Sequence, residues 1–125
     1  MQHVESTTQQ ACVFWFGYQY PKLKNNLFSI PNGAALHGTP KQRSIQWKRL
    51  EREGALAGVA DLFLAVPNKH HHGIFIEVKS QVGTMSKSQT AFRQSVIDQN
   101  YCHVVCRDTM QFQQIITRYL SDATI

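Results

Sequence analysis

The chain has 125 residues, of which 42% are hydrophobic and 17% are charged, values typical of one globular domain with its own core. Its formal net charge of +5 and its pI of about 9.3 favour a polyanionic partner, nucleic acid above all. No apolar run approaches the roughly 18 residues of a membrane span, and the N-terminus does not read as a secretory leader.

The cysteines indicate a reducing compartment rather than a disulfide framework. Cys12, Cys102 and Cys106 form an odd and scattered set. Cys102-His103-x-x-Cys106 has some likeness to a metal cluster, but strand alternation would place His103 opposite both cysteines. We therefore expect buried, unpaired cysteines here.

Residues 3–20 are predicted to form a helix that ends at Pro21, because apolar side chains recur in it at helical spacing. Phe14, Trp15 and Phe16 follow one another and cannot all face one side. Such a helix either lies deep in the fold or buries a second face against another molecule.

A short strand is predicted at 27–30, followed by a turn at Pro31-Asn32-Gly33 and a loop over 34–39. Thr39-Pro40 then begins a helix in the preferred order, a cap followed by proline, and Gly54 ends it after Glu53.

This second helix is predicted to contact phosphates, because it carries five basic residues against two acidic ones. The basic residues are Lys41, Arg43, Lys48, Arg49 and Arg52. The alternative is a solvated helix with internal ion pairs.

Two strands are predicted at 61–66 and 74–79, and their apolar residues at both odd and even positions indicate burial on both faces. The loop between them contains His70, His71 and His72. A histidine triplet can bind metal, but in a hairpin it is more typical of a solvated tip.

A loop over 80–85 leads to a helix capped by Ser86 and running to about residue 100. A strand at 101–106 and a helix at 109–120 complete the chain. The predicted inner stripe of the helix that Ser86 caps consists of Gln89, Phe92, Arg93, Val96 and Ile97.

Asp61, Glu77 and Lys79 are the main candidates for chemistry. Glu77 and Lys79 are two residues apart on a strand, so both point the same way. Two carboxylates and an ammonium suit a hard divalent cation with an oriented water, which is the equipment for metal-assisted phosphodiester hydrolysis. The alternative is a turn aspartate and a solvated ion pair; burial of both strands argues against it, because buried charges are costly unless paired or metal-bound.

Gln89 and Glu5 are supporting candidates. Gln89 lies in the first turn of its helix, from which it would point back to the charged end of the sheet and hydrogen-bond a phosphate or the attacking water. Glu5 lies on one helical stripe with Gln9 and could reach the metal centre, although a first-turn acid also complements the helix dipole.

These residues together resemble the PD-(D/E)xK nuclease superfamily, and within it the VRR-NUC (virus-type replication-repair nuclease) family. The matching features, spread from about residue 4 to residue 120, are Glu5-Ser6-x-x-Gln9, Gly58-Val59-Ala60-Asp61-Leu62, Phe75-Ile76-Glu77-Val78-Lys79, Met85-Ser86-x-x-Gln89, Val104-Val105 and Arg107-Asp108. The sequence departs from many relatives at Ala60, where they carry proline. Proline contributes backbone geometry rather than a ligand, so the difference need not abolish activity.

The resemblance implies a single VRR-NUC nuclease domain over residues 1–125, with an α/β, restriction-endonuclease-like core and a mixed four-stranded sheet flanked by helices. It implies Mg²⁺ or Mn²⁺ held by Asp61, Glu77 and the backbone carbonyl of Val78, with Glu5 joining directly or through water. Lys79 would position the attacking water, and Gln89 would support the lysine or the phosphate.

The implied activity is that of a metal-dependent DNA endonuclease selective for branched DNA such as Holliday junctions. The alternatives are a non-cutting nucleic-acid-binding module and a nuclease for ordinary duplex or single-stranded DNA. Symmetric junction cleavage needs two sites, so we expect a homodimer, with Trp15 or Phe14 as the anchor of its interface. The expected location is the cytoplasm of a bacterial or phage-infected cell.

Overall fold

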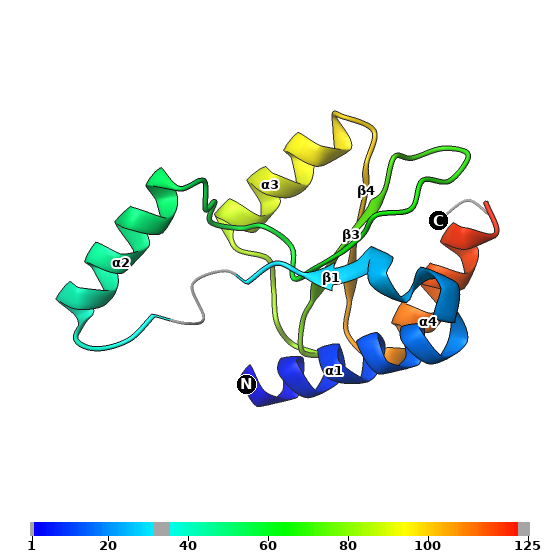
Figure 1. The fold of residues 1–125 in the computed structure, drawn as a ribbon, viewed down its shortest axis with the longest axis horizontal. Helices are drawn as coiled ribbons and strands as arrows, with labels where there is room; N and C mark the ends of the chain where they lie inside the picture. Colours follow the sequence, from blue (N-terminus) through cyan, green and yellow to red (C-terminus); the bar gives the residue numbers. More distant parts are fainter. Residues whose placement is uncertain (1, 32–35, 123–125) are drawn as a thin grey trace.

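The computed structural model describes residues 2–31 and 36–122, and the predicted turn and loop lie partly outside these ranges, at 32–35. Figure 1 shows the arrangement of the elements. They are α1 (Gln2–Gln19), the 3₁₀ helix η1 (Pro21–Asn26), β1 (Leu27–Ser29), α2 (Pro40–Arg52), β2 (Leu62–Leu64), β3 (Ile74–Val78), α3 (Lys87–Ile97), β4 (Cys102–Cys106) and α4 (Thr109–Leu120).

The four strands form one mixed sheet in the order β1-β2-β3-β4. β1 pairs antiparallel with β2, and β2 pairs antiparallel with β3, while β3 and β4 are parallel. The prediction of an α/β fold with a mixed four-stranded sheet is confirmed.

One face of the sheet forms the main core under α1 and α4. Phe16 of α1 and Phe112 of α4 are fully buried there with the even-numbered residues of β2 and β3. The opposite face carries α3, where the ring of Phe92 packs edge-on against Phe75. Phe63 and Phe75 on this face are only half-buried, so the expectation of full burial on both faces was wrong.

The structure shortens or corrects several predicted elements. The 3₁₀ helix η1 was not predicted; it begins at Pro21, which fixes a backbone angle suited to a first turn. β2 begins after Asp61 and ends at Leu64, and α3 ends at Ile97. Arg93, predicted to face inward, is exposed.

The aromatic residues of α1 divide between core and solvent. Trp15 packs edge-on against Tyr20 and Phe112 of the same chain, so its use as a free interface anchor is not supported. Phe14 is 77% exposed and Tyr18 is 79% exposed. Among the residues described, no helix is both long enough and apolar enough to cross a membrane.

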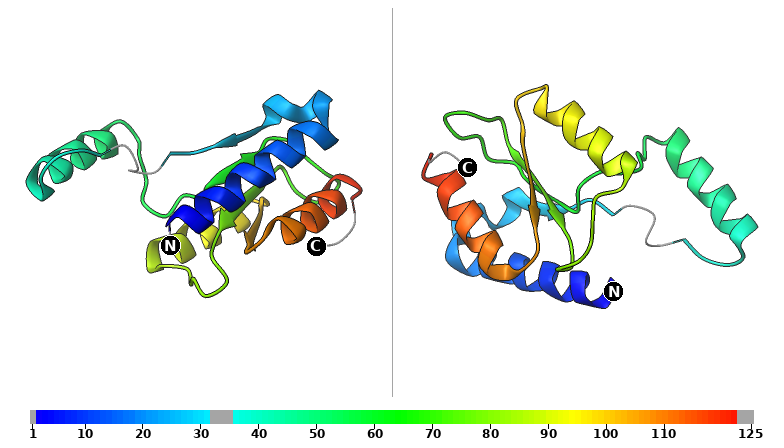
Figure 2. Two further views of the ribbon diagram at one scale, coloured as in Figure 1. Left: turned by 90° about the horizontal axis from the view of Figure 1, so that it is seen from below. Right: turned by 180° about the vertical axis from the view of Figure 1, so that it is seen from behind.

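Helix α2 stands apart from the other elements in every view (Figure 2). A capping box joins Thr39 and Gln42 at its start, so local hydrogen bonds stabilise the helix without a buried face. None of its residues is buried.

The cysteines and histidines behave as expected from alternation. Cys12, Cys102 and Cys106 are buried and unpaired, and His103 lies on the other face beside Phe92. In the histidine loop, His71 is half-buried against Tyr119, and its neighbours His70 and His72 are exposed.

Candidate active site

The antiparallel pairing of β2 with β3 brings the two candidate carboxylates together. Leu62 pairs with Ile76, which sets Asp61, one residue earlier, across from Glu77. Glu77 is only 3% exposed, because both neighbouring strands and the first turn of α3 surround it. The Lys79 Nζ atom lies 3.8 Å from Glu77 Oε2, so the ammonium and the carboxylate share one face of the strand end.

Hydrogen bonds fix both carboxylates. Asp61 Oδ2 accepts from the backbone N–H of Val78 at 2.7 Å. Glu77 Oε2 accepts from Gln89 Nε2 at 3.1 Å, while Gln89 Oε1 accepts from the backbone N–H of Ser86 at 2.9 Å. The capping box of α3 therefore holds the Gln89 amide in the orientation that reaches Glu77.

The site is electrostatically poised for positive charge. Burial and the neighbouring Asp61 carboxylate raise the pKa of Glu77 to about 8, although Lys79 opposes the shift. Burial also raises the pKa of Asp61, and the Val78 N–H opposes that rise. Two neighbouring carboxylates that repel each other, one buried and one half-buried, favour either a shared proton or a bound cation.

The donor set fits a divalent cation. Among the described residues, the buried Glu77 Oε1 has no hydrogen-bond partner, which is costly unless something else satisfies it. Within the same residues, no three His, Cys, Asp or Glu side chains converge on one point. Mg²⁺ is commonly held by one or two carboxylates, with waters and substrate phosphate completing the octahedron, so Asp61 and Glu77 suit it.

Glu5 lies at the edge of this site and is engaged by the backbone. Its Oε2 atom accepts from the N–H of Ser80 at 3.2 Å, directly after Lys79. Glu5 and Asp61 also line one hollow of about 1,060 Å³, together with Arg43. The structure thus places Glu5 beside the carboxylate pair without adding it as a third converging ligand.

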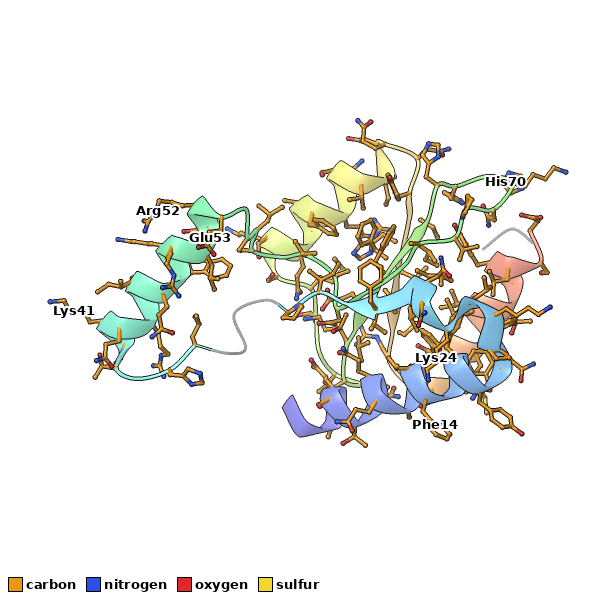
Figure 3. All side chains as sticks on the ribbon, viewed as in Figure 1. Phe14, Lys24, Lys41, Arg52, Glu53 and His70 are labelled. Carbon is orange, nitrogen blue, oxygen red and sulfur yellow. The ribbon has the colours of Figure 1, made fainter. Side chains whose placement is uncertain are left out.

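The predicted DNA-contacting residues are exposed but are not gathered at the carboxylates. Of the five basic residues of α2, only Arg43 lines the hollow. Figure 3 shows Lys41 and Arg52 extending from α2 away from the sheet.

Two residues that shape the site, Gly58 and Arg107, were noted in the sequence only as parts of family motifs, with no role assigned to them. Gly58 has φ of +91°, and a Cβ there would overlap the backbone of Ser88 and Gln89. This close approach lays the segment before Asp61 against the first turn of α3. Arg107 binds the loop after Lys79. Two features of the sequence could have indicated these roles: Gly58 lies three residues before Asp61, and Arg107 directly follows a predicted strand.

The VRR-NUC domain family model matches residues 3–109. The chain belongs to the VRR-NUC family. A solved structure described as "VRR_NUC domain protein" superposes with a TM-score of 0.80 at 20% identity, covering 96% of this chain and 90% of that chain. A comparison with curated proteins gives no match.

Membership confirms the predicted resemblance and places the chain in a nuclease family, with DNA as the implied substrate. The VRR-NUC match ends at the start of α4, yet Phe112, Ile116 and Tyr119 of α4 are fully buried in the main core. Helix α4 is thus integral to the fold that supports the site.

Proposed function

We propose that this VRR-NUC protein is a metal-dependent endonuclease that hydrolyses DNA phosphodiester bonds, with selectivity for branched DNA. The observation that carries the proposal is the pairing of half-buried Asp61 with buried Glu77, with an unpartnered carboxylate oxygen on Glu77 and the Lys79 ammonium alongside. A site kept only for binding would have no need of a buried carboxylate, Glu77, beside a second carboxylate, because this arrangement costs stability.

Each residue has a defined part in this proposal. Asp61 and Glu77 would hold Mg²⁺ or Mn²⁺, aided by the backbone carbonyl of Val78. The bound cation supplies an activated water and stabilises charge on the phosphate. Lys79, held 3.8 Å from Glu77, positions the water and carries positive charge toward the phosphate. Gln89 keeps Glu77 oriented through its hydrogen bond.

Glu5 contributes at the margin of the site. Its Oε2 atom accepts from the Ser80 N–H, and the carboxylate would join the cation directly or through a water. Glu5 thereby also connects α1 to the strand that carries Glu77 and Lys79.

The basic residues of α2 would track the phosphate backbone outside the cut site. All five, Lys41, Arg43, Lys48, Arg49 and Arg52, are exposed on a helix that packs no face against the core. Such an arm suits a polyanion that extends beyond the domain.

Symmetric cleavage of a four-way junction requires two active sites related by a two-fold axis, so for that substrate the proposal includes a homodimer. A DNA substrate and three unpaired buried cysteines suit a reducing compartment that contains DNA. We accordingly place the protein in the cytoplasm of a bacterial or phage-infected cell.

The test compares cleavage of four-way junction, flap, duplex and single-stranded DNA, each with Mg²⁺, Mn²⁺ or EDTA. The proposal expects the junction to be cut fastest, and only with metal. Equal cutting of all substrates would favour a general nuclease. Binding without cutting in any metal would favour the non-cutting module, and Glu77→Ala provides the inactive control.

A further inference from the structure

Arg107 uses its side chain to hold the loop that follows Lys79. It lies directly after β4, and its Nη1 atom donates to the carbonyl of Ser80 at 2.7 Å and to that of Gly83 at 2.6 Å. Its own carbonyl accepts from Gln81 Nε2 at 3.4 Å. Side chain and backbone of one residue therefore bind three successive parts of a single loop.

Ser80 is the point where this loop joins the catalytic strand. The Lys79 N–H donates to the carbonyl of Cys106 at 2.9 Å, which extends the β3–β4 pairing to the lysine. The next N–H, that of Ser80, donates to Glu5 Oε2, and the Ser80 carbonyl accepts from Arg107 Nη1. Ser80 is 6% exposed, so the residue directly after Lys79 is buried, and both its N–H and its carbonyl are hydrogen-bonded.

The geometry suits a guanidinium, whose Nη1 atom serves both carbonyls. One planar group reaches two carbonyls of a tight turn, in which Gly83 N–H also donates to the Ser80 carbonyl at 3.3 Å. A lysine ammonium would keep the charge but lacks the fixed, planar directions of the two Nη1 hydrogens. Charge-assisted hydrogen bonds of this kind are also about twice as strong as neutral ones.

We infer that Arg107 is a positioning residue for Lys79: it fixes the turn from Ser80 to Gly83 and so the direction of the Lys79 ammonium at Glu77. The inference rests on the proposed nuclease function for its catalytic consequence. It differs from the obvious alternative, in which an arginine beside a nuclease site binds a DNA phosphate. Here the Nη1 donor binds two backbone carbonyls, which favours positioning, and the salt dependence of DNA binding tests whether the rest of the guanidinium also contacts a phosphate.

The two roles predict different defects. Loss of a phosphate contact weakens DNA binding. It also reduces the salt slope, the slope of the logarithm of the binding constant against the logarithm of the salt concentration, by about 0.9 in magnitude. Loss of positioning slows the chemical step and leaves affinity unchanged, because displacement of a catalytic group by about 1 Å can cost about 10²-fold in rate.

The experiment measures Arg107→Ala and Arg107→Lys against wild type on a four-way DNA junction. Single-turnover rates are taken in Mg²⁺ at saturating protein, and affinities are taken in EDTA at several salt concentrations. Arg93→Ala is the matched control, because it removes the charge of an exposed arginine on α3 and leaves the hydrogen bonds of Arg107 to the loop in place. NMR hydrogen exchange of the Ser80 and Gly83 amides reports the turn without requiring cleavage.

We expect Arg107→Ala to cut about 10- to 100-fold more slowly with unchanged affinity and salt slope. We expect Arg107→Lys to lie between it and wild type, and amide exchange at Ser80 to accelerate in both. If Arg107→Ala does not fold, the same comparison is made with Arg107→Lys. A normal saturated rate, or weaker binding with a flatter salt slope, would overturn the inference.

Failure of this inference is distinguishable from failure of the proposed function. If wild type cuts and the Arg107 variants cut equally well, only the positioning role fails. If wild type cuts no DNA, the nuclease proposal fails. The amide exchange of Ser80 then decides whether Arg107 orders the turn.

Discussion

Replacing Glu77 by glutamine should remove a large pH dependence from the stability of the metal-free protein. The folded state raises the pKa of this carboxyl from 4.5 to about 8, mainly through burial and then through the Asp61 carboxylate. At about 1.36 kcal/mol per pKa unit, this shift corresponds to about 5 kcal/mol. That is a large share of the roughly 5–15 kcal/mol by which domains are stable.

The direction follows from proton binding. Below pH 4.5 the carboxyl is protonated in both the folded and the unfolded states, and its full contribution to stability is present. Between pH 4.5 and about 8 the folded protein keeps a proton that the unfolded chain has lost. The free energy of unfolding therefore falls with rising pH, by about 1.4 kcal/mol per pH unit.

Urea denaturation in EDTA from pH 5 to pH 9 measures this effect. In the Glu77→Gln variant, the unfolding free energy should fall less steeply with pH, by the equivalent of about one bound proton. The variant Glu51→Gln, an exposed control on α2, should keep the wild-type dependence on pH. Mg²⁺ at pH 8 should stabilise wild type and have much less effect on Glu77→Gln. Parallel curves of unfolding free energy against pH for wild type and Glu77→Gln would refute the raised pKa of Glu77.

Four further predictions concern catalysis, binding, folding and assembly. Asp61→Asn should abolish metal-dependent cleavage with the fold intact by circular dichroism, and Lys79→Ala should slow cleavage about 10²-fold or more; wild-type rates in either would contradict the site. Removing the charges of Lys48, Arg49 and Arg52 together should weaken DNA binding for all sequences alike and flatten the salt slope by about 0.9 per lost contact; an unchanged slope would place the DNA elsewhere. Gly58→Ala should lower the free energy of unfolding by about 3 kcal/mol, through positive-φ strain and overlap with the first turn of α3, and equal urea midpoints would disprove that packing. Sedimentation at micromolar concentration should give a dimer mass, and a monomer that still cuts junctions symmetrically with first-order dependence on protein would rule out the dimer.

The sequence by itself determined the elements whose information is local. Alternation placed Glu77 and Lys79 on one face of a strand, and the structure has them 3.8 Å apart. Thr39 and Ser86 were recognised as helix starts, and both are N-caps with complete capping boxes. The direction of Gln89 toward the charged end of the sheet followed from its place in a first turn, and the hydrogen bond to Glu77 agrees.

The tertiary structure alone decided which distant groups meet. Glu5 binds the N–H of Ser80, 75 residues away in the chain, and no spacing pattern encodes such a pair. Trp15 is held by Phe112 while its neighbour Phe14 is exposed, because the packing of α4 selects which stripe of α1 is covered. Hydrophobic periodicity and capping residues determine whether a segment becomes a helix or a strand. Contacts between distant segments, such as the hydrogen bond of Arg107 to the Ser80 carbonyl, depend instead on how all the segments pack together.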